Sequence, residues 1–202
     1  MTASSTLDKS AKTDYDIHPF LANRWSPRAF ADKAIPSAEI GSLLEAARWS
    51  ASSGNSQPWS FIVATRDNAD EYEKMLGVLK EGNQRWAASA PLLILAVAHD
   101  AHTRTISLFD LGLAVQNLTT EAQSRDLFVH QMGGIYPEKA HEIYNVPAEH
   151  KVVVALAVGY LGNPNDLPDD LRERELNERS RKPLASIAFE SEWGKSVSTI
   201  NG

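Results

Sequence analysis

Two uninterrupted apolar runs, Leu92–Ala98 and Val152–Val158, constrain this chain more than any other feature of its sequence. Each run has the length of a β-strand and is far shorter than the ~18–20 residues of a membrane span. A strand without polar alternation is typically covered on both faces, so we expect Leu92–Ala98 to be a strand that is covered on both faces. A further strand is predicted over Trp59–Thr65, which is rich in aromatic and β-branched residues.

Helical periodicity appears in four other segments. The Pro36–Glu39 stretch opens a helix with Ser37 as its predicted N-cap, and that helix should end near Trp49. The longest predicted helix covers Thr103–Arg125, and its apolar stripe is wide enough for deep burial or for packing against another subunit. A polar, exposed helix over Asp67–Lys80 and a short helix over Pro137–Asn145 complete the set. The sequence therefore predicts an α+β domain with about three or four strands and four or five helices.

Composition excludes several classes of protein. The 202 residues suit one domain, and the formal net charge of −6 argues against a general nucleic-acid binder or a binder of anionic membranes. Because the chain has no cysteine, it forms no disulfide and has no thiolate nucleophile or Cys-ligated metal. The N-terminal residues lack the apolar segment of a secretory signal, so we expect a cytoplasmic protein.

The two ends of the chain differ from its middle. Residues 1–17 are polar and are expected to be a flexible N-terminal lead-in. From Leu161 onward the chain is again polar and shows no convincing core pattern, so this part should wrap the domain or reach a partner subunit. We therefore place the folded domain at residues 18–190 and a C-terminal extension at residues 191–202.

Two basic clusters stand out in this acidic protein. Residues 24–28 read Arg-Trp-Ser-Pro-Arg, and two guanidiniums around a hydroxyl can bind a phosphate through several hydrogen bonds. Residues 179–182 repeat the pattern as Arg-Ser-Arg-Lys, which favours one shared anion for both clusters. The alternatives are that Arg28 pairs with Asp32 beside a turn at Ser26-Pro27, and that the late cluster is only a solvated arm.

Two further segments are suited to contact with a ligand. Residues 51–59 read Ala-Ser-Ser-Gly-Asn-Ser-Gln-Pro-Trp, in which small polar residues let a backbone approach and hydrogen-bond a flat ligand. Residues 130–134 read His-Gln-Met-Gly-Gly, and the paired glycines allow unusual φ angles and a close backbone approach. An ordinary loop before the strand and an ordinary turn before the next helix would explain the same compositions, and a lone histidine is more often structural than a base.

Other common motifs are absent from the sequence. There is no Gly-x-Gly-x-x-Gly fingerprint, no phosphate-binding P-loop and no Gly-x-Ser-x-Gly elbow. The pair His99 and His102 lacks a convincing third ligand, so no metal is predicted. No acid, base and nucleophile set stands out either, which suits an enzyme whose cofactor performs the chemistry.

The ordered motifs resemble those of the nitroreductase family of flavin enzymes. The Arg-x-Ser-x-Arg run at 24–28 is followed by the Leu-x-x-Ala-Ala ending of a helix at 43–47 and by Ser-x-x-Asn-x-Gln-Pro-Trp at 52–59. Gly133-Gly134 and the 179–183 run occur in family order, and the resemblance covers roughly residues 20–187. It implies a nitroreductase-like mixed, mostly antiparallel sheet flanked by helices, in an intertwined homodimer with extended terminal arms.

The resemblance also implies which residues bind the cofactor, flavin mononucleotide (FMN). Arg24, Trp25, Ser26 and Arg28 would contact its phosphate, ribityl or pyrimidine atoms, and Arg179 and Arg181 would complete the phosphate site. Asn83 and Met132 would lie beside the flavin, as would the glycines, with the Gly133 backbone near flavin N5. The partner subunit would contribute its own copies of Ala51, Ser52, Ser53 and Asn55.

The implied activity passes a hydride from NAD(P)H through flavin N5 to a small oxidised substrate such as a nitroaromatic or a quinone. Because the two substrates would take turns over one ring face, ping-pong kinetics are expected. No side chain is expected to act as a proton-transferring catalyst, and neither a nucleic acid nor a membrane is expected as a partner. Two alternatives remain: an FMN-binding storage or sensor module without nicotinamide turnover, and a flavin-free dimer whose arms exchange for structural reasons.

Overall fold

The computed structural model describes residues 7–200, and the chain divides into two compact units. The larger unit is Ser10–Leu176, and the smaller one joins Met1–Lys9 to Asn177–Gly202. The first six residues of the predicted lead-in and the last two of the predicted extension lie outside the described residues. The sheet and all seven α-helices described here belong to the larger unit.

The larger unit contains one four-stranded sheet with the order β1-β2-β4-β3. Its strands are β1 (Trp59–Thr65), β2 (Leu92–Ala98), β3 (Phe128–Met132) and β4 (Lys151–Gly159). Each pair of neighbouring strands is antiparallel, which confirms the mostly antiparallel sheet that we predicted. All residues of β2 are buried, as expected for a strand covered on both faces.

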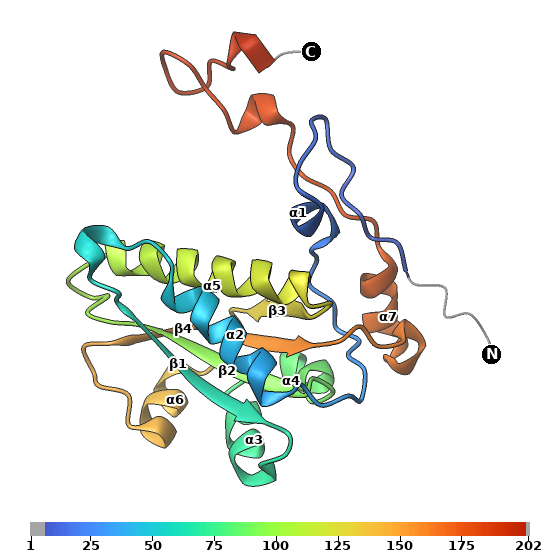
Figure 1. The fold of residues 1–202 in the computed structure, drawn as a ribbon, viewed down its shortest axis with the longest axis vertical. Coiled ribbons are helices and arrows are strands. Elements are labelled where there is room, and N and C mark those ends of the chain that lie inside the picture. Colours follow the sequence, from blue (N-terminus) through green and yellow to red (C-terminus); the bar gives the residue numbers. More distant parts are fainter. Residues whose placement is uncertain (1–6, 201–202) are drawn as a thin grey trace. The chain divides into compact units, whose positions relative to one another are not determined.

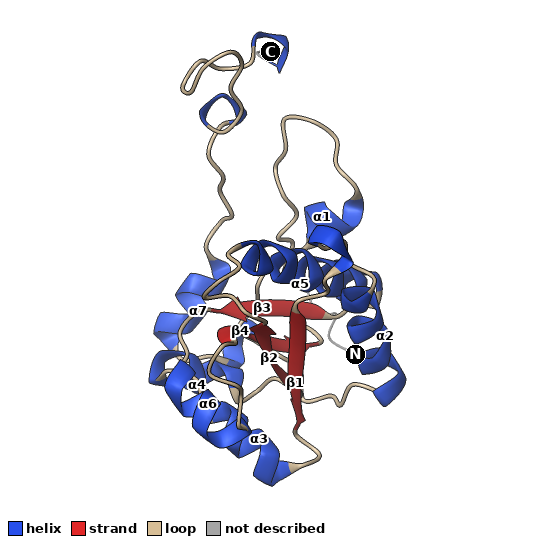
Figure 2. Ribbon diagram, turned by 90° about the vertical axis from the view of Figure 1, so that its left-hand side faces the viewer, coloured by secondary structure: helices blue, strands red, loops and turns tan. Residues whose placement is uncertain are grey.

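Alternation along β2 divides the core into two layers. Ile94 and Ala96 pack in the cluster that includes residues of α2 (Ser37–Arg48) and α5 (Ile106–Ser124). Leu93 and Leu95 point the other way, because successive side chains of a strand lie on opposite faces. Figures 1 and 2 show α2 and α5 on one side of the sheet, with α3 (Ala69–Leu76), α4 (Glu81–Ala87) and α6 (Pro137–Tyr144) on the other. The predicted α+β class is therefore confirmed.

The long helix α5 has one side buried against the sheet and apolar residues exposed on the other. Its inward positions, Leu111, Ala114 and Leu118 among them, are buried against the sheet. Its outward positions include Phe109, which is 61% exposed, and Ile106, which is 42% exposed. The predicted helix over Thr103–Arg125 is thus confirmed to within a turn, with an apolar outer face at its N-terminal end.

Two helix predictions need correction. Helix α2 begins at Ser37 itself, and its N-cap is Pro36, which makes no side-chain capping bond. The predicted exposed helix over Asp67–Lys80 is shorter, as α3, and it is not simply exposed, since Tyr72 and Met75 are buried in the core. Leu79, which we placed in the same helix, lies beyond α3, pairs with Ile135 in an isolated antiparallel bridge and is also buried.

Several elements were not predicted from the sequence. They are α1 (Pro19–Asn23), α4, β3 and α7 (Asp169–Leu176), and the short 3-10 turns Ser53–Asn55, Pro164–Asp166, Leu184–Ser186 and Ser198–Ile200. Helix α7 buries Leu171 and Glu175. We predicted that the chain after Leu161 has no core pattern. This prediction is wrong for α7, whose two buried residues are the apolar Leu171 and the charged Glu175.

The described part of the smaller unit consists of residues 7–9 and 177–200. Arg179 donates a hydrogen bond of 2.5 Å to the carbonyl oxygen of Lys9. Phe189 pairs with Ser196 in an isolated antiparallel bridge, and its ring packs against Trp193. Within residues 7–200, no helix combines the length and the apolar character that crossing a bilayer requires.

Two tyrosines of the larger unit whose hydroxyls are buried give a matched test of this packing. The Tyr72 hydroxyl lies 3.0 Å from the Ala87 carbonyl oxygen and 2.5 Å from that of Ala90. The Tyr144 hydroxyl is buried and finds no hydrogen-bond partner among residues 7–200. Tyr72→Phe should lower the free energy of unfolding by about 1–2 kcal/mol, whereas Tyr144→Phe should be neutral or stabilising. Urea denaturation measures both, and equal losses would contradict the assigned hydrogen bonds.

Candidate functional site

The Arg24–Arg28 segment presents its polar side chains on one side. Trp25 and Pro27 are buried, and the alternate residues Arg24, Ser26 and Arg28 are partly exposed. Because burial alternates along the segment, the two guanidiniums and the hydroxyl lie on its solvent-facing side. The indole of Trp25 packs edge-on against the Phe128 ring, so only its main chain faces the surface that we predicted to bind a ligand.

A buried carboxylate holds this segment from the direction of helix α7. Both side-chain oxygens of Glu175 lie 2.9 Å from the backbone nitrogen of Arg28, and one lies 3.1 Å from that of Ala29. The Arg28 guanidinium is 3.9 Å from the same carboxylate. The alternative prediction, an ion pair between Arg28 and Asp32, is therefore wrong. Asp32 instead pairs with Arg66 at 3.0 Å.

Strand β3 holds the segment from another direction. The Nδ1–H of His130 donates to the carbonyl oxygen of Pro27 at 2.8 Å, and the His130 ring packs against Trp86. The Ser26 hydroxyl lies 3.5 Å from the side-chain oxygen of Gln131, at the limit of a hydrogen bond. Burial lowers the pKa of His130 to about 4, with a smaller lowering from Arg28, so the ring is neutral at pH 7.

The end of β3 meets the start of α4 at the two glycines. Asn83 donates its side-chain N–H to the carbonyl oxygen of Gly134 at 3.0 Å. A Cβ on Gly134 would lie 2.7 Å from that amide nitrogen, so the contact requires glycine, whereas a Cβ on Gly133 would meet nothing within 4 Å. The predicted unusual φ angles are absent, since neither glycine has a positive φ, and the close backbone approach to a ligand stays a prediction. The Met132 side chain is buried in the core.

The predicted segment Ala51–Asn55 is held by α5. The backbone nitrogen of Ser53 donates to the buried carboxylate of Asp110 at 3.1 Å. The Ser52 hydroxyl accepts a 3.0 Å hydrogen bond from the backbone nitrogen of Gln57, and Asn55 adopts a left-handed φ of 55°. Ala51 is exposed at the start of this loop.

Helix α5 separates the two groups of predicted ligand residues. Near its N-terminal end Asp110 binds Ser53, and further along Thr119 accepts a 3.0 Å hydrogen bond from Gln131, the neighbour of Ser26. Asp110 and Thr119 are nine positions apart in the helix, which corresponds to about 13 Å along its axis. The larger unit thus brings together residues 24–28, Asn83 and 132–134, and it places residues 51–55 at the other end of α5.

The late basic cluster, residues 179–182, lies in the smaller unit. Arg179 donates to Lys9, as stated above, and Arg181 is exposed and donates to the carbonyl oxygen of Ser180 at 2.7 Å.

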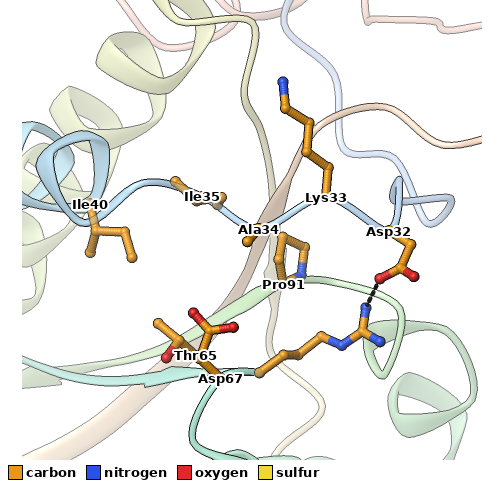
Figure 3. Close-up of a pocket in the computed structure, with 9 residues that line it drawn as sticks. Asp32, Lys33, Ala34, Ile35, Ile40, Thr65, Asp67 and Pro91 are labelled. Atoms are coloured by element: carbon orange, nitrogen blue, oxygen red, sulfur yellow. Dashed lines mark hydrogen bonds and ion pairs between the residues drawn. The ribbon is translucent and has the colours of Figure 1, made fainter.

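One compact pocket lies away from all of these residues. It has a volume of about 240 Å³, below the roughly 300–1,000 Å³ usual for sites that enclose drug-sized ligands. Figure 3 shows it at the end of β1, with the Arg66–Asp32 ion pair on its wall and the Lys33 ammonium pointing away. It is lined by Asp32, Lys33, Ala34, Ile35, Ile40, Thr65, Arg66, Asp67 and Pro91. Because none of the predicted ligand residues lines it, we do not take it as the functional site.

Of the two histidines considered as metal ligands, His99 stacks on His150, and no contact joins it to His102 among the interactions described. The rings of His99 and His150 are 4.4 Å apart and nearly parallel, and the Ser60 hydroxyl lies 2.8 Å from Nε2 of His99. The pKa of His99 is lowered, first by burial and then by the neighbouring His150. Residues 7–200 contain no group of three or more potential ligands that could hold a metal ion.

Sequence reasoning missed the two carboxylates that hold the predicted loops. Asp110 carried a usable signal, because it interrupts the apolar stripe of the predicted 103–125 helix. Glu175 carried none, since it lies in the charge-rich stretch Asp-Asp-Leu-Arg-Glu-Arg-Glu-Leu, where an acidic residue is expected to be solvated.

Comparisons with known proteins agree with these motifs. Residues 21–160 match the nitroreductase family, and the chain belongs to that family. A solved structure described as an oxidoreductase containing FMN superposes with a TM-score of 0.87 at 34% identity, over 94% of this chain and 98% of the other. A 15.4 kDa protein of Mycolicibacterium smegmatis is 35% identical over 66% of this chain and 97% of its own length. The FMN reductase (NADPH) of Bacillus subtilis is 27% identical over 71% of this chain and 65% of its own length.

The buried His130 predicts a pH dependence of stability. Its pKa of about 4 in the folded protein lies below the ordinary 6.5, so between these values the unfolded chain binds a proton that the folded chain does not. Stability should therefore fall as the pH drops from about 6.5 towards 4, by up to about 3 kcal/mol for this group. Because His130→Gln does not titrate, its deficit relative to the unsubstituted protein should shrink over this range in urea denaturation. The exposed control His102→Gln should show no such change, and a constant deficit for His130→Gln would contradict the assignment.

Proposed function

We propose that this protein is an FMN-dependent oxidoreductase that passes a hydride from NAD(P)H to a small oxidised substrate such as a nitroaromatic or a quinone. The observation that carries the proposal is the shared surface of Arg24, Ser26 and Arg28, held from β3 and α7 in a member of the nitroreductase family. The names of two similar proteins, one containing FMN and one an FMN reductase that uses NADPH, support this choice of cofactor and reductant.

The residues of this surface fit a phosphorylated flavin. A phosphate monoester is a dianion at neutral pH, and two guanidiniums with a hydroxyl between them match its charge and its acceptor oxygens. The net charge of the chain is −6, so such an anion needs a local basic site of this kind. The open side of Gly133 leaves room for a flat ring next to the main chain.

Each part of the site has its own task in this proposal. Bound FMN supplies the hydride-transfer chemistry through its N5 atom. Arg24, Ser26 and Arg28 would bind the phosphate and the neighbouring oxygens. The main chain at Met132–Gly134 would line the ring and offer it the Gly133 N–H, and Asn83 supports this turn. Fixed N–H donors of this kind favour the charge that develops on a reduced flavin without a proton-transferring side chain.

A second copy of the chain completes the proposed site. Residues 51–55 attach about 13 Å along α5 from the Arg24–Arg28 side, which supports their proposed contact with the flavin of the partner. Three large apolar side chains near α2 and α5 are exposed: Trp49 (74%), Phe109 (61%) and Ile106 (42%). Apolar groups gathered on one side of a protein favour an interface, so we propose a homodimer that buries them.

The absorption spectrum and its response to NAD(P)H test the proposed activity. The purified or FMN-reconstituted protein should be yellow, with a flavin band near ~450 nm that belongs to the cofactor. Anaerobic addition of NADH or NADPH should bleach this band, and a quinone or nitroaromatic should restore it. Bound flavin that neither nucleotide reduces would favour a storage or sensor module instead. Protein that takes up no FMN would refute the proposal.

Single arginine substitutions test the phosphate site. Arg24→Ala or Arg28→Ala should each weaken FMN binding about ten- to a hundredfold, because each removes a charge-assisted hydrogen bond to phosphate. Arg66→Ala is the matched control, since it removes the same charge from a surface ion pair outside the site. Fluorescence titration of the apoprotein measures all three affinities. Equal affinities for all three variants would place the phosphate elsewhere.

A charge on the outer face of α5 tests the dimer. Phe109→Glu puts a carboxylate in the proposed apolar interface, so it should shift the protein towards a monomer and reduce its flavin content together. Light scattering after size-exclusion chromatography measures the mass, and the absorbance ratio at 450 and 280 nm gives the flavin content. A Phe109→Glu dimer with full flavin content would place the interface on another face.

A further inference from the structure

We propose that Glu175 is a positioning residue of the phosphate site, because its buried carboxylate fixes the peptide unit that presents Arg28 to the ligand. This inference rests on the proposed function, since it assigns a role within the same FMN site. It concerns a residue that would not touch the cofactor itself.

The contacts of Glu175 are unusual for an acidic side chain. The residue is 1% exposed, and burying a carboxylate costs several kcal/mol unless hydrogen bonds replace its lost hydration. Here the replacements are main-chain N–H groups: Arg28 at 2.9 Å from each oxygen and Ala29 at 3.1 Å. An apolar residue at position 175 would fill the space but would leave those N–H groups without an acceptor.

One peptide unit is held at both of its ends. The carbonyl oxygen of Pro27 accepts from His130, and the N–H of Arg28, which belongs to the same peptide group, donates to Glu175. Because a peptide group is planar, fixing its oxygen and its hydrogen fixes its orientation. The further hydrogen bond from the Ala29 N–H to Glu175 restrains the rotation that remains at Arg28, and with it the direction in which the Arg28 side chain leaves the backbone. The two holding residues come from β3 and α7, far apart in the sequence.

The surroundings of Arg28 restrict its side chain as well. Its guanidinium lies 3.9 Å from the Glu175 carboxylate and 6.0 Å from the centre of the Trp86 ring. A free arginine loses much rotational freedom when it binds a ligand, so partial ordering beforehand lowers that cost. The N–H groups of residues 28 and 29 are already bound by Glu175, which leaves the guanidinium as the group that meets the phosphate.

Helix α7 supplies the rigid support for this contact. Leu171 and Glu175 lie one helical turn apart and are the two buried residues of α7. Leu171 packs in the hydrophobic core, so it fixes the helix, and Glu175 then reaches the Arg24–Arg28 segment from a defined place. Glu173 lies on the same helix and is exposed, which provides a matched control.

The test compares FMN with riboflavin, which lacks the phosphate. In apoprotein titrations, Glu175→Gln should weaken FMN binding about tenfold and riboflavin binding by less than about twofold, because the neutral amide loses the charge that strengthens both hydrogen bonds and places an NH2 donor beside the Arg28 N–H. Glu173→Gln, with the same change of charge on the same helix, should leave both affinities unchanged. If Glu175→Gln weakens the binding of FMN and of riboflavin equally, the substitution disturbs the whole flavin site and not the phosphate site alone. That result would overturn the inference. Unchanged affinities overturn it as well.

Amide hydrogen exchange of the unsubstituted protein gives a second test that does not depend on how the variant folds. If Glu175 holds the N–H groups of Arg28 and Ala29 in advance, both amides should already be protected in the apoprotein, and FMN should not change their protection. Protection that appears only when FMN is added would mean that the phosphate takes these N–H groups, which would overturn the inference.

The two proposals fail in different ways. An unsubstituted protein that binds no FMN, or whose flavin is not reduced by NADH or NADPH, refutes the proposed function. An unsubstituted protein that binds and reduces FMN normally, while Glu175→Gln keeps the same ratio of FMN to riboflavin affinity, refutes only the positioning role of Glu175.

Discussion

Complete burial of strand β2 is the constraint on which the rest of the larger unit depends. Because none of its side chains reaches water, helices must cover both faces of the sheet, with α2 and α5 on one side and α3, α4 and α6 on the other. This arrangement leaves β3 at an edge of the sheet, next to β4. The edge position lets His130 and Gln131 reach the Arg24–Arg28 segment instead of a fifth strand.

The buried carboxylates of the larger unit share one function in the structure. Among the residues described, Asp110 and Glu175 are the acidic side chains that are buried, and each accepts hydrogen bonds from main-chain N–H groups of a predicted ligand segment. A buried charge contributes little to stability compared with an apolar residue of similar size. The benefit of such a buried carboxylate is conformational specificity, because only one arrangement of the surrounding backbone satisfies its hydrogen bonds.

The sequence predicted those parts of the fold that carry an apolar pattern. The boundaries of β1 and β2 coincide with the predicted ones, and α2, α5 and β4 differ by a few residues, because burial on one or both faces determines their composition. Strand β3 contains His130 and Gln131, and α7 turns a glutamate inward, so neither shows an apolar period. The residue types of the candidate site were predictable from local motifs. Their supports were not, because Glu175 lies 147 positions from Arg28.

The contact between Glu175 and residues 28–29 is made mainly with the main chain, and this has an evolutionary consequence. A carboxylate that binds backbone N–H groups is indifferent to the side chains that those residues carry. Mutations at position 28 can therefore accumulate without disturbing the course of the polypeptide through this region. A descendant of this protein could replace Arg28 by another residue and so bind a different ligand, while the backbone conformation of residues 28–29 stays the same.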